Sequence, residues 1–385
     1  MSRSYTTVEL LSELVSFDTT SRNSNLDLVH FIGDYLNDYG VFCRLIPDES
    51  GKKANLHAIL GPRQAGGIGL SGHMDTVPVD GQTWSADPFK LREENGLLYA
   101  RGATDMKGFV ASALAAIPAV AQLDVRQPLH LLLTYDEELG SLGAPRLIAD
   151  LRDTGLVPNV CVVGEPSEMK ALVGHKGKLA VRVKVRGRPG HSSQPALGVN
   201  AIYAASEAIA FVAAEGRRFA LEGPFEDGYD PPHTTTHVGL VSGGTSLNMI
   251  PDQAAFVMEW RVIAANDPKV ELERLKAYVA EVIEPAMKRV DPESGFSFEV
   301  TTQYPGFLLD PDHDLAITVK DIVGSNDTIK VSFGTEAGLY QQAGITSIVC
   351  GPGNVAQAHQ PDEWIARSEL DACDRFILGL AQQLI

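Results

Sequence analysis

The sequence predicts an α/β protein whose mixed, mostly parallel sheet has helices on both faces and which carries an inserted ferredoxin-like α+β domain. Between residues 56 and 164, short apolar strands alternate with segments of helical spacing, a rhythm typical of parallel sheets. After residue 178 the order becomes β-α-β-β-α-β, and the first rhythm resumes near residue 304. We therefore expect one domain of residues 1–177 and 304–385, interrupted by a second of residues 178–303.

The elements of the first domain follow from hydrophobic periodicity and from helix start and stop signals. Thr6 and Glu9 have capping-box spacing, and Gly40 ends the second of two helices predicted within residues 6–40. The later elements are strand 56–60, a strand ending at His73, helix 106–123, strand 128–135, helix 141–154 and strand 159–164. The run 67–72 fits the dinucleotide-binding spacing GxGxxG, but it lies within a predicted strand and opens no helix, so we reject that function.

The inserted domain and the end of the chain show the same kinds of pattern. The inserted elements are strand 178–186, helix 199–219, strands 234–241 and 253–263, helix 268–288 and strand 296–302. After residue 304 the pattern predicts strand 345–350, a glycine loop at 351–353 and a last helix capped at Ser368.

Composition excludes several classes of function. A net charge of −17 argues against nucleic acid or an anionic membrane as partner, because both need a basic surface. The chain has no apolar run of about eighteen residues and no apolar signal-peptide core at its N-terminus, so we expect a cytoplasmic protein. The cysteines lack CxxC spacing, which favours reduced thiols over disulfides or a thiolate metal site. Any bound metal must then have nitrogen and oxygen ligands.

Acidic and histidine side chains gather at the predicted carboxyl ends of the strands, where ligands bind in such folds. The HxD pair of His73 and Asp75 can orient a metal-binding imidazole, although such a pair taken alone is also typical of a histidine that caps a loop. The set suited to two zinc, cobalt or manganese ions that share one bridging carboxylate is His73, Asp105, Glu138, Glu165 and His359. Glu137 is left to move a proton, so the set predicts metal-assisted amide hydrolysis.

Short motifs in register along the chain resemble those of a known family. They are SGHMDTVP, GATDMKG, TYDEELGS, GEPS, GHSSQP and AHQPDEW. Together they resemble the dinuclear metallo-amidohydrolases, which include acetylornithine deacetylase, succinyl-diaminopimelate desuccinylase, aminoacylase and glutamate carboxypeptidase. The resemblance covers nearly the whole chain and implies a zinc-exopeptidase-like fold whose inserted domain is a lid that forms a homodimer.

The same resemblance implies a role for each site residue. His73, Asp105 and Glu165 would hold one metal ion, and Asp105, Glu138 and His359 the other. Asp105 would bridge the two ions. Asp75 would orient His73, and Glu137 would be the general base.

The resemblance also assigns roles to the inserted domain. His191 would stabilise the oxyanion, in its own subunit or in the partner, and Asn248 with Arg261 would hold a substrate carboxylate. Arg261 also fits a surface strand position without a role, and His175 with Lys176 could be hinge or substrate contacts.

The substrate is predicted from likeness within the family. The segment Gly334-Thr-Glu336-Ala and the glycine loop after Cys350 most resemble acetylornithine deacetylase, which implies cleavage of N2-acetyl-L-ornithine to L-ornithine and acetate in arginine biosynthesis. Glu336 would attract the substrate ammonium, unless it only caps a loop. The alternatives are a desuccinylase, an aminoacylase, a metallo-carboxypeptidase and a non-catalytic metal- or peptide-binding relic. The intact ligand and base positions disfavour the relic.

Overall fold

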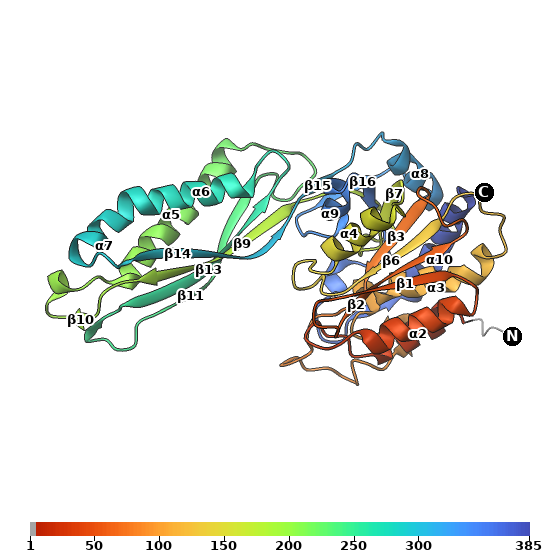
Figure 1. Ribbon diagram of the computed structural model, residues 1–385, viewed down its shortest axis with the longest axis horizontal. Coiled ribbons are helices and arrows are strands. Elements are labelled where there is room, and N and C mark those ends of the chain that lie inside the picture. The colour runs from red at the N-terminus through yellow and green to blue at the C-terminus, as the bar shows by residue number, and fades with distance from the viewer. Residues whose placement is uncertain (1–4) are drawn as a thin grey trace. The chain divides into compact units, whose positions relative to one another are not determined.

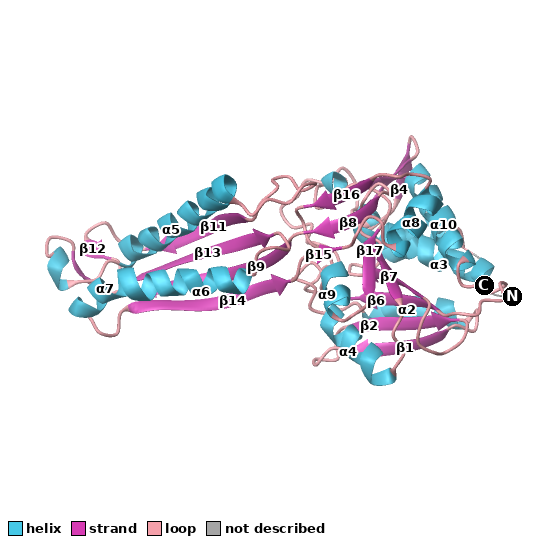
Figure 2. Cartoon of the chain, turned by 90° about the horizontal axis from the view of Figure 1, so that it is seen from above, coloured by secondary structure: helices cyan, strands magenta, loops and turns pink. Residues whose placement is uncertain are grey.

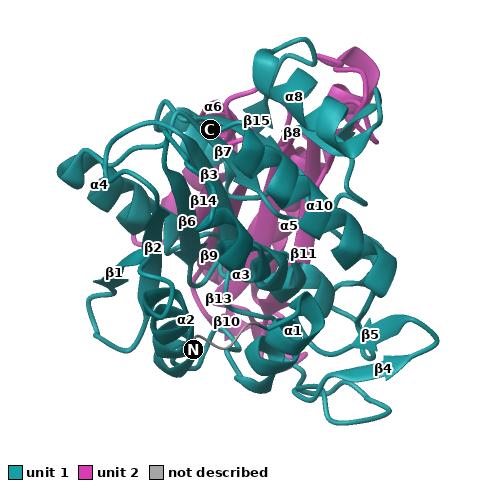
Figure 3. Cartoon of the chain, turned by 90° about the vertical axis from the view of Figure 1, so that its right-hand side faces the viewer, with its two compact units in different colours: residues 1–174, 307–330, 335–385 teal, residues 175–306, 331–334 magenta. Residues whose placement is uncertain are grey.

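The computed structural model describes residues 5–385, which divide into two compact units (Figure 3). The first unit contains residues up to 174 together with 307–330 and 335–385. The second contains residues 175–306 and 331–334. None of the helices formed by residues 5–385 combines the length and the apolar character that crossing a bilayer requires.

A nine-stranded sheet forms the centre of the first unit (Figures 1 and 2). Its order is β1-β2-β6-β3-β7-β17-β8-β15, with β16 paired to β8. The strands are β1 (Phe42–Pro47), β2 (Ala54–Leu60), β3 (Ile68–His73), β6 (Leu129–Thr134), β7 (Val160–Val163), β8 (Ala171–His175), β15 (Phe307–Leu308), β16 (Thr328–Val331) and β17 (Thr346–Val349). The central strands β6, β3, β7 and β17 run parallel, whereas β1, β2 and β8 pair antiparallel. This mixed sheet confirms the predicted α/β class.

Helices cover both faces of this sheet. The helices are α1 (Thr7–Ser16), α2 (Leu26–Asn37), α3 (Gly108–Val120), α4 (Ala144–Thr154), α8 (Asp314–Val323), α9 (Ala337–Gln342) and α10 (Arg367–Gln382). On β3, a Cβ at Gly72 would meet Val110 of α3 at 3.1 Å, so glycine permits this close approach. The neighbouring Ser71 hydroxyl lies 3.0 Å from Tyr340 Oη of α9. Because successive strand residues point to opposite faces, α3 and α9 lie on opposite sides of the sheet.

Several local predictions are confirmed. Thr6 and Glu9 form the expected capping box, since the Thr6 N–H donates to the Glu9 carboxylate at 2.8 Å and the Glu9 N–H donates to the Thr6 hydroxyl at 3.2 Å. The GxGxxG run, apart from Gly67, lies within β3 and opens no helix, as predicted. The described cysteines are all free thiols.

Other local predictions are wrong. The helix expected from residue 106 starts at Gly108, because Asp105 and Met106 leave helical dihedrals within the irregular turn η1 (Ala103–Lys107). Helix α10 starts at Arg367 without a side-chain cap, so Ser368 is not its cap. The prediction also omits strand β1 and a small sheet of β4 (Arg92–Glu94), β5 (Leu97–Tyr99) and β18 (Trp364–Ala366).

The second unit is a four-stranded sheet with helices against one face (Figure 2). Its elements are β9 (Gly177–Arg186), α5 (Ala201–Glu222), β11 (Thr235–Gly243), β13 (Gln253–Val262), α6 (Pro268–Tyr278), α7 (Glu284–Val290) and β14 (Gly295–Tyr304). The sheet order is β11-β13-β9-β14, and the short pair β10 (Gly190–His191) and β12 (Met249–Ile250) lies outside it. Alternate residues of β9 and β13, such as Val183 and Phe256, join the helices in one apolar core. The elements follow the predicted β-α-β-β-α-β order.

Candidate metal centre

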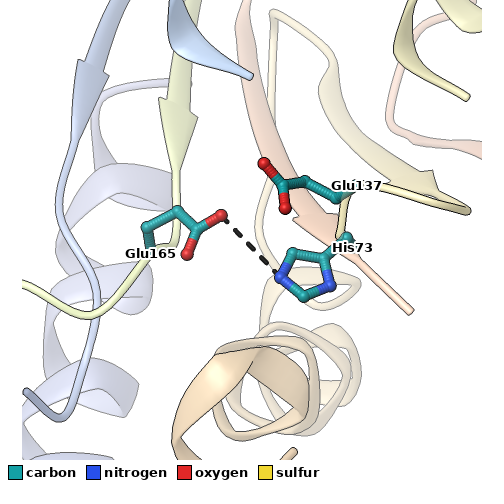
Figure 4. Close-up of side chains that lie close together, drawn as sticks. All are labelled: His73, Glu137 and Glu165. Atoms are coloured by element: carbon teal, nitrogen blue, oxygen red, sulfur yellow. Dashed lines mark ion pairs between the residues drawn. The ribbon is translucent and has the colours of Figure 1, made fainter. Parts of the chain in front are cut away.

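The strand ends of the first unit bring predicted residues together. His73, the last residue of β3, pairs in register with Thr134, the last residue of β6. The loop with Glu137 therefore follows β6 directly beside His73. Glu165 follows β7, which pairs in parallel with the other edge of β3. Because parallel strands end at one edge of a sheet, His73, Glu137 and Glu165 lie close together (Figure 4).

Asp105 divides its two carboxylate oxygens between two histidines. Its Oδ1 lies 2.9 Å from Nε2 of His73, and its Oδ2 lies 3.1 Å from Nε2 of His359. The same His359 nitrogen lies 3.2 Å from Glu138 Oε1. The extended dihedrals of Asp105 within η1 belong to this arrangement. One carboxylate thus faces two separate imidazole donors, as a ligand shared by two cations must.

Two overlapping groups of donor atoms meet at His73. One group is His73, Asp105 and Glu138, and the other is His73, Glu137 and Glu165; within each group the donor atoms lie within 4.8 Å of one another. His73 Nε2 is 3.8 Å from Glu165 Oε1 (Figure 4). Glu137 therefore lies inside the donor cluster and not beside it.

Asp75 anchors the loop that carries Glu137 and Glu138. Its carboxylate accepts the N–H of Glu137 at 3.0 Å, the N–H of Glu138 at 3.3 Å and the hydroxyl of Ser21 at 2.7 Å. His73 Nδ1 donates to the main-chain carbonyl oxygen of Asp75 at 2.9 Å. That bond places the hydrogen on Nδ1 and leaves Nε2 directed at the carboxylates.

Burial and charge shift the titration of the cluster. Burial raises the pKa of Glu165 well above its usual value, and the nearby Asp105 charge raises it further. Burial likewise raises the pKa of Glu137. Hydrogen bonds to Asp105 and Glu138 raise the pKa of His359 to about 10. Burial opposes the charge on His73, but its hydrogen bonds to Asp105 and Asp75 raise its pKa well above the usual value. In the cluster, bound protons thus offset the negative charge of the carboxylates. Divalent cations could offset the same charge.

The donor set fits two divalent cations. It contains imidazole nitrogens and carboxylate oxygens, the ligands that zinc and related first-row ions accept. If Asp105 is shared, each ion receives one histidine, one carboxylate of its own and one Asp105 oxygen. Three protein donors per ion leave coordination positions for water and substrate, as catalytic sites require.

Glu336 is buried beneath the strand ends. It is 1% exposed, and its Oε2 accepts the Ser71 hydroxyl at 3.3 Å. Burial raises its pKa to about 7. Although it stands at the N-terminal cap position of α9, its side chain makes no capping hydrogen bond, so the loop-cap alternative is wrong.

His191, Asn248 and Arg261 belong to the second unit. His191 and Asn248 are neighbours, because β10 pairs with β12 and the Ser192 N–H donates to the Asn248 carbonyl at 3.1 Å. Arg261 lies near the far end of β13, eight residues beyond Gln253, or about 26 Å along an extended strand. Its guanidinium contacts Glu259 at 3.0 Å and the Tyr304 hydroxyl at 2.6 Å. Asn248, in contrast, directly precedes β12, close in sequence to Gln253 at the start of β13.

Several residues that support the centre were not predicted from the sequence. Lys53 pairs with Asp136 at 2.6 Å, next to Glu137, and Ser21 donates to Asp75. Neither Lys53 nor Ser21 lies in a recognisable motif. Arg101 and Glu363 form a buried ion pair at 2.7 Å beneath the Asp105 loop. Glu363 belongs to the AHQPDEW motif, so the sequence could have indicated that it contributes to the site.

Comparison with known proteins gives concordant results. The model of the family described as peptidase family M20/M25/M40 matches residues 69–383. An acetylornithine deacetylase of Aliivibrio salmonicida is 34% identical over 363 residues, which cover 94% of this chain and 92% of that protein. An M20 family metallo-carboxypeptidase of Sulfolobus solfataricus has a similar fold, with a TM-score of 0.76, 17% identity and 98% of each chain covered. A dinuclear metal-binding M20 peptidase of Bacillus subtilis has a TM-score of 0.69 and 15% identity, with 98% of each chain covered.

Proposed function

This chain belongs to peptidase family M20/M25/M40, and from that premise we propose that it hydrolyses N2-acetyl-L-ornithine to L-ornithine and acetate with two bound metal ions. The chain is a metallo-hydrolase of that family. The specific substrate, the identity of the ions as zinc or cobalt, and the place of the reaction in arginine biosynthesis are parts of the proposal.

The division of Asp105 between His73 and His359 carries the proposal. We assign Asp105 as the bridging ligand. His73 and Glu165 would complete one site, and Glu138 and His359 the other. The two cations would supply Lewis-acid activation of the attacking water and of the amide carbonyl.

Glu137 is the general base of this proposal. It is a buried carboxylate within the donor cluster, and Ser141 Oγ donates to its Oε1 at 3.3 Å. Its backbone is held by Asp75. A carboxylate whose pKa burial has raised can take a proton from water and keep it until the leaving amine nitrogen accepts it.

The choice of substrate rests on two observations. The 34% identity to an acetylornithine deacetylase spans nearly the whole of both chains. Glu336 lies next to β3, where its Oε2 accepts the hydroxyl of Ser71, two residues before His73, at 3.3 Å. A carboxylate there would favour a cationic side chain and disfavour the second carboxylate of a succinyl group.

Residues of the second unit would complete substrate binding. We propose His191 as the oxyanion stabiliser, because an imidazole can donate to the developing charge. Arg261 would bind the substrate carboxylate as a planar fork, which requires it to exchange its contact with Glu259. Asn248, which neighbours His191, would contact the substrate separately from Arg261.

A homodimer through the second unit is part of the proposal. Its support is the edge strand β11, where Leu240 and Val241 are 67% and 69% exposed. Apolar residues on an unpaired strand edge favour pairing with another chain. The free cysteines support a cytoplasmic, reducing location.

A substrate comparison tests the proposed function. Purified protein loaded with Zn²⁺ or Co²⁺ is assayed for kcat/KM on N-acetylornithine, N-succinyl-diaminopimelate, N-acetylmethionine and a dipeptide. We expect the highest value for N-acetylornithine and no turnover after chelation. A preference for the succinylated substrate would identify a desuccinylase, and a preference for the dipeptide would identify a peptidase. Turnover that survives complete metal removal would refute the metal-dependent mechanism.

A further inference from the structure

The Glu363 carboxylate accepts hydrogen bonds from several backbone N–H groups of the loop that carries Asp105. Its Oε1 accepts the N–H of Thr104 at 2.9 Å and the N–H of Asp105 itself at 3.1 Å. Its Oε2 accepts the N–H of Gly102 at 3.0 Å and Nη1 of Arg101 at 2.7 Å. Both members of the ion pair are 1% exposed. One buried side chain thus accepts three peptide N–H groups, those of Gly102, Thr104 and Asp105, around a single metal-ligand position.

Arg101 extends this network to the segment that carries His359. Its Nη2 donates to Gln82 Oε1 at 2.5 Å, and Gln82 Nε2 donates to the main-chain carbonyl oxygen of His359 at 2.9 Å. His359 has a φ of 61°, a left-handed conformation that costs energy for a residue other than glycine. The bond from Gln82 helps to hold this residue where Asp105 and Glu138 face its imidazole.

The same two chain segments are joined on the other side of Glu363. Strands β5 and β18 pair antiparallel, with Trp364 opposite Tyr99. The Ala100 N–H donates to the Glu363 carbonyl at 3.1 Å, and the Thr104 hydroxyl donates to the Trp364 carbonyl at 2.5 Å. The Asp105 loop and the His359 segment therefore have one continuous connection, although Glu363 and Asp105 lie 258 residues apart in sequence.

We infer that Glu363, Arg101 and Gln82 are positioning residues that set the spacing between the shared ligand Asp105 and the terminal ligand His359. This inference rests on the proposed metal pair. A carboxylate can bind two ions at once only if its position relative to both imidazoles is fixed. Residues that hydrogen-bond to the metal-ligating residues fix such positions. Glu363 acts on Asp105, so it influences both ions. Gln82 also accepts a bond from Arg101, but its direct bond to a metal-ligand residue is to the carbonyl oxygen of His359, so its main effect is on one ion.

Metal affinity, measured apart from turnover, tests the inference. Apo protein is titrated with Co²⁺ against a competing chromophoric chelator, and the visible Co²⁺ absorption is recorded. We expect Glu363→Gln to weaken both ions, by about 10–100-fold, since loss of groups behind metal ligands has effects of this size. Gln82→Ala should weaken the binding of the ion held by His359 by more than that of the other ion. Because Gln82 is only partly buried, that variant keeps the test decisive if Glu363→Gln does not fold.

A matched control separates positioning from general stability. Asn25 makes a buried two-bond contact to the backbone of Ala54, at 2.9 Å in each direction, and is bonded to no ligand loop. Asn25→Ala should lower the melting temperature and leave both Co²⁺ affinities unchanged. The inference is overturned if Glu363→Gln and Gln82→Ala bind both ions as wild type does, or if Asn25→Ala weakens binding equally. A wild-type protein that binds fewer than two ions would instead refute the proposed function.

Discussion

His73 Nδ1 lies 2.9 Å from the main-chain carbonyl oxygen of Asp75 but 3.5 Å from its carboxylate Oδ1. The imidazole is therefore oriented mainly through the backbone of Asp75. The Asp75 carboxylate is engaged by the peptide N–H groups of Glu137 and Glu138 and by Ser21. The aspartate of the HxD pair thus serves a second loop as well as the histidine two residues before it.

Removing the Asp75 side chain should release the loop of the general base. We expect Asp75→Ala to lower kcat by about 10–100-fold, the range seen when groups behind metal ligands are lost, and to weaken the ion that Glu138 would hold with Asp105 and His359, because Asp75 also accepts the Glu138 N–H. Steady-state kinetics with metal analysis measures both effects. Ser21→Ala, which removes only one donor to Asp75, is the control and should have a much smaller effect. An increase in KM at constant kcat would contradict this role.

Replacing Glu137 should separate catalysis from metal binding. In Glu137→Ala we expect both ions to remain and turnover to fall by about 10²–10⁴-fold, because only the proton transfer is lost. Glu138→Ala is the contrasting variant and should lose metal as well. The donor atoms of Glu137, His73 and Glu165 lie within 4.8 Å of one another, so these three side chains could also hold one ion together. Loss of one ion in Glu137→Ala would therefore identify Glu137 as a ligand.

Metal affinity should increase with pH. Burial raises the pKa of Glu165 well above its usual value, and hydrogen bonds raise the pKa of His359 to about 10, so protons compete with a cation for both donors in the metal-free protein. A cation must displace these protons, so affinity falls as the pH is lowered and rises as it approaches 10. Competition titrations at several pH values, with calorimetric detection of proton release, measure this. Affinity that is constant across the range would show that the donors are already deprotonated.

A charge on the edge of β11 should prevent assembly. Leu240→Lys places an ammonium on an exposed apolar strand edge, so we expect a monomer by light scattering where the wild type is a dimer. Val300→Lys is the matched control, because Val300 is 49% exposed on β14, the opposite edge of the same sheet. A wild-type monomer would refute the dimer. If the wild type is a dimer and only Val300→Lys disrupts it, the interface lies at β14 and not at β11.

The preference for a cationic substrate should titrate with Glu336. Its pKa is raised to about 7, so its charge appears as the pH rises through that value. We expect the ratio of kcat/KM for N-acetylornithine over N-acetylmethionine to rise across the same range, and to be lower and independent of pH in Glu336→Gln. Tyr340→Phe is the control, since it removes the second partner of Ser71 and keeps the carboxylate. A ratio unchanged by Glu336→Gln would leave Glu336 with a structural role only.

The sequence alone determined the α/β class and the location of the centre. Both depend on local order: strand residues alternate in direction, and the carboxyl ends of parallel strands share one edge. His73, Glu137 and Glu165 could therefore be placed near one another from strand endings. The start of α3 could not be predicted from the sequence, because Asp105 and Met106 leave helical geometry within η1 although the sequence pattern there is helical.

Only the tertiary structure decided how the donors share their oxygens. Three features depend on contacts between segments distant in sequence. Asp105 faces two imidazoles, Asp75 holds the Glu137 loop, and Glu336 is buried beneath the strand ends. Arg101 and Glu363 meet for the same reason. Periodicity specifies the direction of a side chain within its own element, but the partner of a buried polar group depends on where another segment places its donors.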